Sequence, residues 1–186
     1  MMAGKSILSK RSVLFSASSS WEIEIMFATE IHVNSFLLNY AEGLLKEIPE
    51  ERMAEQPFPG VNHPAWIIGH LTNTADAVAV ILGGSKELPE SWPKLFGRDS
   101  EPTSHREDYP GKAELLDLLK SRYWAVQQLL STVPESLLKA ANPRPQMQDR
   151  LPAVSDLVSF VLTGHFGIHL GQLSTWRRLV GMGRLF

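Results

Sequence analysis

The sequence predicts an all-α protein: a single four-helix bundle with a long loop between its second and third helices. Three observations predict this fold. Apolar residues recur at helical spacing in four long segments, no segment alternates apolar and polar residues as a half-buried strand does, and prolines lie at or beyond the ends of the four segments. With 186 residues, the chain is the size of one ordinary domain.

Composition restricts the classes of function. Hydrophobic residues make up 44% of the chain and charged residues 20%, which is typical of a globular protein with a real core. The net charge of −2 does not favour a nucleic-acid partner, and no apolar run approaches the length of a membrane span. There is no cysteine, so any bound metal must have nitrogen or oxygen ligands, and we expect a cytoplasmic location.

The N-terminus differs from the rest of the chain. Its first twenty residues are rich in serine and basic, with Lys5, Lys10 and Arg11 and no acidic residue, and they lack the continuous apolar segment of an export signal. We therefore expect residues 1–22 to form a disordered or poorly packed extension, and residues 23–186 to form the bundle. A transit or export role for the extension is the less favoured alternative.

The first two helices have clear ends. The first is expected over about residues 24–48, where Pro49 ends it. His32 within it has no histidine at helical spacing and should lie at the surface or in an interface. The second begins at Asn62-His63-Pro64, a capping side chain followed by a proline in the first turn. It runs to about Leu82, and Gly83-Gly84 ends it.

A long loop and two more helices follow. Residues 85–111 contain four prolines and no clean period, and the aromatic side chains of the loop are expected to pack it onto the bundle as a lid; His105 within it should be exposed. The third helix is expected over about residues 112–133. The fourth runs from near Pro152, with Ser155 as a cap, to Gly181. The side chains proposed to hold the lid in place are Trp92, Leu95, Phe96 and Tyr109.

Two histidines interrupt the apolar face of the fourth helix. His165 and His169 are four residues apart, which places their Cβ atoms about 5–6 Å apart on one face. A buried polar group costs free energy unless it has a binding partner, so this pair of histidines should have a structural or functional role. On another face of the helix, Gly164, Gly167 and Gly171 predict close approach by a second helix, from the bundle or from another subunit; simple tolerance of glycine is the alternative.

A third histidine completes a candidate metal site. His70 lies on the second helix, on the face that also carries His63, Trp66 and Asn73. His70, His165 and His169 would hold a metal through three nitrogens and leave a fourth position open, as catalytic zinc sites do. The alternative is that the histidines are core residues bonded to backbone or water. The metalloprotease motif His-Glu-x-x-His is absent, because Phe166 follows His165.

Four further residues are expected around this site. Gln172 and Asn73 would orient an imidazole or contact the substrate, and Trp66 shares the face of His70. For His63 three roles remain open: a fourth ligand, a substrate contact or a helix-start residue, of which we favour the last.

The motifs NHPAWIIGH (62–70) and GHFGIHLGQL (164–173), with the tail WRRLVG (176–181), resemble the DinB-like superfamily, also called YfiT-like, of metal-dependent four-helix bundles. The likeness covers about residues 25–186. It implies an up-down-down-up bundle, often a homodimer, with zinc or nickel held by His70, His165 and His169. Members of known activity include thiol transferases that use bacillithiol, mycothiol or glutathione, and a mycothiol-dependent maleylpyruvate isomerase.

The resulting hypothesis is a metal-dependent S-transferase that activates a low-molecular-weight thiol for transfer to a small electrophile. Two alternatives stay open at this point. The first is a metal-dependent hydrolase that acts on esters or amides without a thiol. The second is a non-catalytic bundle that binds a structural metal or serves as a dimerisation module.

Overall fold

The computed structural model describes the backbone of residues 20–185 and the side chains of residues 26–185. Within that range every element of regular secondary structure is a helix and there is no strand, so the all-α prediction is confirmed. The predicted extension, residues 1–22, lies outside the described residues except for 20–22, whose backbone already belongs to α1. The long helices are α1 (Ser20–Lys46), α2 (Pro64–Ile81), α4 (Lys112–Leu130) and a C-terminal segment composed of α6 (Val154–Ser159), η4 (Phe160–His165) and α7 (Phe166–Leu179).

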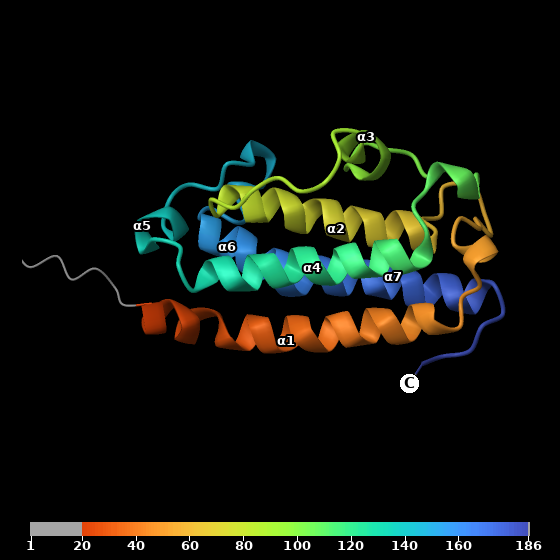
Figure 1. Ribbon diagram of the computed structural model, residues 1–186, viewed down its shortest axis with the longest axis horizontal. Coiled ribbons are helices and arrows are strands. Elements are labelled where there is room, and N and C mark those ends of the chain that lie inside the picture. Colours follow the sequence, from red (N-terminus) through yellow and green to blue (C-terminus); the bar gives the residue numbers. More distant parts are fainter. Residues whose placement is uncertain (1–19, 186) are drawn as a thin grey trace, which may run out of the picture.

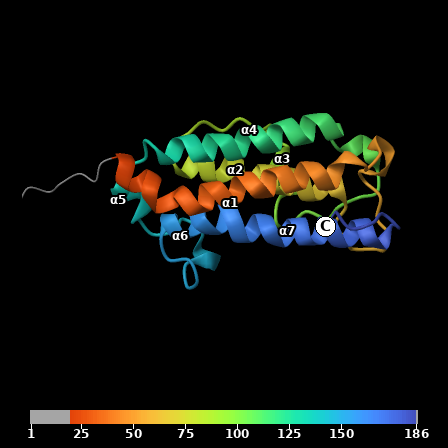
Figure 2. The same ribbon diagram turned by 90° about the horizontal axis from the view of Figure 1, so that it is seen from below.

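These four long segments lie side by side along the longest axis of the molecule (Figures 1 and 2). The segments α1 and α6–η4–α7 run in one direction, and α2 and α4 run in the other (Figure 1). Helix α2 packs along α4 and α7, and α1 packs against η4, α7 and α4. The core between them is apolar and fully buried, and includes Leu44, Ile67, Leu119, Phe166 and Trp176.

Helix α2 begins and ends where the sequence predicts. His63 is its N-cap, and the side chain of this residue, rather than that of Asn62, accepts the Trp66 backbone N–H at Nδ1, at 3.2 Å. Pro64 occupies the first helical position, where its missing N–H costs nothing. After Ile81, Gly83 adopts φ +91°, a left-handed conformation that ends the helix and that other residues rarely adopt.

The loop between α2 and α4 contains two short helices, α3 (Trp92–Phe96) and η2 (Arg106–Asp108). Its aromatic residues Trp92, Phe96 and Tyr109 are buried, and α3 packs directly against α2. This close approach depends on Gly69, since a Cβ atom there would lie 2.1 Å from the Phe96 ring. The loop therefore rests on α2 through a contact that only a glycine allows.

The fourth predicted helix is not one continuous α-helix. Phe160–His165 forms a π-helical turn between α6 and α7, and this turn was not predicted. A π turn accommodates an extra residue, which leaves backbone groups without their usual α-helical partners. The buried side chain of Asn34 on α1 donates to the Leu162 carbonyl, at 2.7 Å, and accepts from Gln127 on α4, at 2.8 Å. The wide turn is thus tied to both neighbouring helices.

Two details of the C-terminal segment differ from the prediction. Ser155 is not the cap: the helix starts after Ala153, whose N–H donates to the Asp156 carboxylate, at 2.9 Å. Nor does another helix of the described chain approach the glycines closely. A Cβ atom on Gly167 or Gly171 would meet nothing within 4 Å, and one on Gly164 would meet only Phe160 of the same segment. Contact of these glycines with a second subunit stays a prediction.

The remaining short helices are η1 (Glu50–Arg52), α5 (Glu135–Leu138) and η3 (Pro145–Met147). They lie in the connections, and η3 precedes α6 at the end of the molecule where α5 also lies (Figure 1). No helix of the described chain is both long and apolar enough to cross a membrane.

Candidate metal centre

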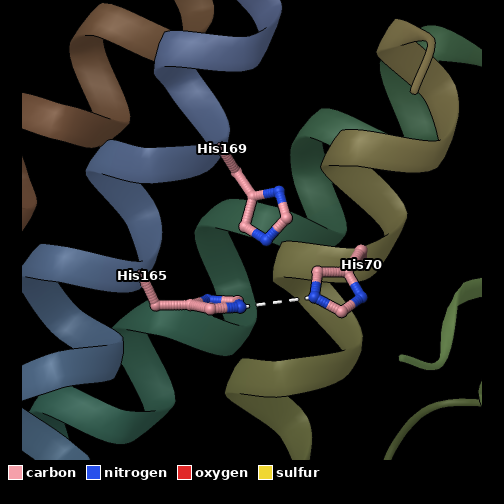
Figure 3. A group of neighbouring side chains, drawn as sticks. All are labelled: His70, His165 and His169. Carbon is pink, nitrogen blue, oxygen red and sulfur yellow. Dashed lines mark hydrogen bonds between the residues drawn. The ribbon is translucent and has the colours of Figure 1, made fainter. Parts of the chain in front are cut away.

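Three histidines converge between α2 and the C-terminal segment. His70 projects from α2, His165 is the last residue of the π-helical turn, and His169 lies one turn later on α7 (Figure 3). Each offers one ring nitrogen to a common point, and these nitrogens lie within 4.8 Å of one another. The two closest are the Nε2 atoms of His70 and His165, which are 3.3 Å apart.

Hydrogen bonds fix which nitrogen two of the rings present. Nδ1–H of His70 donates to the Phe96 carbonyl, at 2.7 Å, because a carbonyl can only accept. Nδ1–H of His169 donates to Oε1 of Gln172, at 3.0 Å, and the same oxygen accepts from Asn62, at 3.2 Å. Both rings therefore turn an unprotonated Nε2 toward the centre, which is the arrangement that outer hydrogen bonds produce in histidine metal sites.

The three imidazoles are neutral at physiological pH. Burial, together with proximity to the other rings, lowers the pKa of His165 to about 3 and that of His169 to about 4, although the bond to Gln172 opposes the shift of His169. Burial also lowers the pKa of His70, although its bond to Phe96 opposes the shift. Arg144 contributes to the lowered pKa of both His70 and His165. Because metals bind unprotonated imidazole, the cluster is in its ligating form without prior loss of a proton.

The residues present fit a divalent transition metal. In a tetrahedral site with bonds of 2.0–2.1 Å, two ligand atoms are about 3.3–3.4 Å apart, which matches the separation between His70 and His165. Nitrogen ligands suit zinc and nickel and do not suit magnesium or calcium, which take oxygen. Nδ1 of His165 is buried and has no hydrogen-bond partner among the described residues, so packing against Phe160 and His169 holds this ring instead.

Trp66 supports the cluster from the outside. Its ring stacks on His70 with centroids 4.7 Å apart and planes 8° from parallel. Its indole N–H donates to Ser100, at 2.9 Å, and Ser100 in turn donates to the carbonyl of Gly97, next to Phe96. Trp66 thus connects the ligand on α2 to the loop that carries its hydrogen-bond partner.

Asn73 lies apart from the three histidines. It is half-buried and lines a different pocket, together with Asp76 and Arg144. The group that contacts Nδ1 of His70 is the carbonyl of Phe96, so Asn73 does not orient this ring. His32 and His105, predicted at the surface, are both exposed.

His63 does not belong to the ligand cluster. It is fully buried at the start of α2, where its ring meets the edge of Tyr109 at 4.7 Å and its Nε2 has no partner in the described part of the chain. Burial lowers its pKa to about 4. The folded protein therefore holds this imidazole neutral over a pH range in which the unfolded chain, with a pKa near 6.5, binds a proton.

Acid should consequently destabilise the metal-free protein through His63. A depressed pKa contributes stability that is complete above about pH 6.5 and is lost progressively as the pH falls toward 4. Between pH 7 and pH 5 this group should cost about 2 kcal/mol of unfolding free energy. The variant His63→Asn keeps a capping side chain and does not titrate. When the pH is lowered from 7 to 5, its free energy of unfolding, measured with urea, should therefore fall by about 2 kcal/mol less than that of wild type. Equal losses in the two proteins would contradict this account.

Sequence reasoning missed three contributors. The Phe96 carbonyl is a backbone group, which no side-chain pattern reveals. Asn62 was interpreted only as a cap, although it bonds Gln172. Arg144 lies in a loop, where no side-chain pattern marks it, and the only signal in the sequence is its position between two prolines.

Comparison with known families agrees with the resemblance seen in the sequence motifs. The family model described as the DinB superfamily matches residues 36–173, well over half of the chain and including all three histidines. The chain belongs to the DinB superfamily. No curated protein matches it. As a DinB-superfamily protein it carries a three-histidine cluster that can hold a divalent metal, as the resemblance implied.

Proposed function

We propose that this DinB-superfamily protein is a divalent-metal-dependent S-transferase that activates a low-molecular-weight thiol and transfers it, through its sulfur, to an electrophile. The observation that carries the proposal is the convergence of three neutral imidazoles from two helices, with two of their tautomers fixed. The cluster is also accessible: His70 and His165 line a pocket of about 500 Å³. A ligand set that faces a pocket has room for a substrate beside the ion.

The chemistry follows from the ligand set. Zinc or nickel, when bound, supplies a Lewis acid that lowers the pKa of a thiol, and the thiolate is the nucleophilic form of sulfur. The thiol loses its proton to solvent, a bond forms between sulfur and the electrophilic carbon, and the leaving group departs with the electrons of the broken bond. The chain keeps the three imidazoles neutral by burying them. It orients the rings of His70 and His169 through Phe96, Trp66 and Gln172.

Thiol transfer is better supported than hydrolysis by what surrounds the histidines. Hydrolysis at a metal usually also requires a general base, often a carboxylate. The side chains that line the pocket beside His70 and His165 include no Asp or Glu. A thiol has less need of such a base, because its pKa of about 8.5 is already far below that of water.

The proposal includes the scaffold and the setting. The directions of the helices in Figure 1 support an up-down-down-up four-helix bundle. A homodimer and a cytoplasmic location complete the proposal, and neither changes the chemistry at the histidines.

A thiol-dependence assay tests the function. Zinc- or nickel-loaded protein is incubated with an activated aryl chloride and, in separate reactions, with bacillithiol, mycothiol, glutathione or no thiol. We expect thioether formation that requires one of the thiols, stops on treatment with a chelator and returns when the metal is added back. Turnover of a nitrophenyl ester without thiol, and no thioether with any thiol, would favour the hydrolase instead. No turnover of either kind would favour a non-catalytic bundle.

A further inference from the structure

The pocket beside the histidines is lined by cations. Arg98, Arg144 and Arg150 share it with His70 and His165, and no carboxylate lies among its lining residues. The three arginines come from separate stretches of chain: Arg98 follows α3, Arg144 precedes η3, and Arg150 precedes α6. A pocket with this charge, next to a site suited to a divalent cation, favours a negatively charged occupant.

Among the three arginines, Arg144 is distinguished by being partly buried without a side-chain partner. It is half-buried, and burial lowers the pKa of its guanidinium. Yet its side chain makes no ion pair or hydrogen bond with any residue that the structure describes. Two other arginines with little exposure are partnered: the half-buried Arg122 bonds Asp76, at 3.1 Å, and the buried Arg177 bonds the Leu44 carbonyl, at 2.7 Å. A partly desolvated charge without a protein partner is available for an anion, and a bound anion would offset the cost of its partial burial.

The backbone holds Arg144 in place. It lies between Pro143 and Pro145, which restrict its conformation, and its N–H donates to the Asn142 side chain, at 3.0 Å. Asn142 is fully buried and also donates to the Leu151 carbonyl, at 2.9 Å, which closes the loop that carries Arg150. The arginine is therefore anchored on a braced loop before any ligand arrives, which lowers the entropy cost of binding.

We propose that Arg144, assisted by Arg98 and Arg150, binds an oxyanion of the substrate, a carboxylate or a phosphate, while the reactive end of the same molecule lies at the histidines. A guanidinium suits both anions, because it donates two parallel hydrogen bonds to either. The assignment of the reactive end rests on the proposed function, whereas the binding of the oxyanion does not. The substrate class is then a small thiol or electrophile that carries an acidic group.

A matched pair of probes tests the binding. The thiols 3-mercaptopropionate and 3-mercapto-1-propanol have similar length and differ in the carboxylate, and isothermal titration calorimetry measures each against metal-free and zinc-loaded protein. We expect metal-free wild type to bind the carboxylate probe at least about 10-fold more tightly than the alcohol, since a hydrogen bond to a charged group contributes about that factor or more. Inorganic phosphate as a competitor distinguishes the two anions: displacement of the probe indicates that phosphate is also accepted.

The variant Arg144→Met should remove the discrimination between the two probes, and the exposed Arg178→Met on α7 should keep it. If Arg144→Met does not fold, the double variant with Arg98→Met and Arg150→Met, both exposed, should weaken binding of the carboxylate probe several-fold. Equal affinity of metal-free wild type for the two probes, or discrimination that survives in the folded variant, would overturn the proposal. This binding is measured on metal-free protein. The proposed oxyanion site can therefore be confirmed or rejected even if the protein shows no thiol transfer.

Discussion

Replacing His165 by alanine is expected to abolish stoichiometric metal binding. The residue supplies one of three converging nitrogens, and its Nε2 is 3.3 Å from that of His70. Loss of a ligand should weaken zinc binding by more than about 100-fold, since loss of an outer hydrogen-bond partner alone costs about 10–100-fold. Elemental analysis after dialysis, with competition against a chromophoric chelator, measures the effect. Thiol transfer should disappear with the metal.

Two comparisons make this result specific. The exposed His32→Ala should retain one ion per chain. In the absence of metal, His165→Ala should remain folded, because the ring that it removes is only partly buried and its Nδ1 has no partner in the described structure. Only wild type should then gain stability when zinc is added, as mass action requires. A His165→Ala protein that retains one tightly bound ion would show that the ligand assignment is wrong.

Replacing Gly69 by alanine should damage both the fold and the metal site. The added Cβ would lie 2.1 Å from the Phe96 ring, which is itself fully buried, so α3 must move away from α2. Overpacking of this kind costs about 1–3 kcal/mol. The movement also carries the Phe96 carbonyl away from Nδ1 of His70, and zinc affinity should fall by about 10–100-fold. Urea unfolding and chelator competition measure the two effects.

The matched control for Gly69 is Gly171→Ala on α7. A Cβ there would meet nothing within 4 Å, and alanine is favoured over glycine inside a helix by about 1 kcal/mol. Replacement by alanine should therefore lower the free energy of unfolding at Gly69 and leave it unchanged or raise it at Gly171. Unchanged stability and zinc affinity in Gly69→Ala would show that the contact with Phe96 does not position the loop.

Side-chain patterns were sufficient to predict the helical segments and the convergence of the histidines. Apolar spacing located the four long segments, and Pro64 and Gly83 defined the ends of α2. Spacing on two helices selected His70, His165 and His169, and the structure brings their nitrogens together. Each of these signals is local in sequence, and helical periodicity converts it directly into a shared face.

What could not be predicted depends on contacts between distant segments. The hydrogen bond from His70 ends on a backbone carbonyl of α3, which residue types do not specify. The π-helical turn accepts a hydrogen bond from Asn34, more than 120 positions earlier in the chain, and nothing near Leu162 signals this contact. The glycines of the C-terminal segment predict a packing surface, but glycine identity alone cannot show whether a neighbour is present.

The bond between Asn34 and the Leu162 carbonyl has a consequence for how variants of this protein are interpreted. Helix α1 contributes no imidazole to the cluster, yet one of its side chains anchors the turn on which His165 is mounted. A substitution in α1 that lowers metal affinity would therefore act indirectly, by changing the position of the turn that carries His165, and not by removing a ligand. Random mutagenesis scored by metal content alone would count such a position among the ligands, and only a structure of the variant would separate the two.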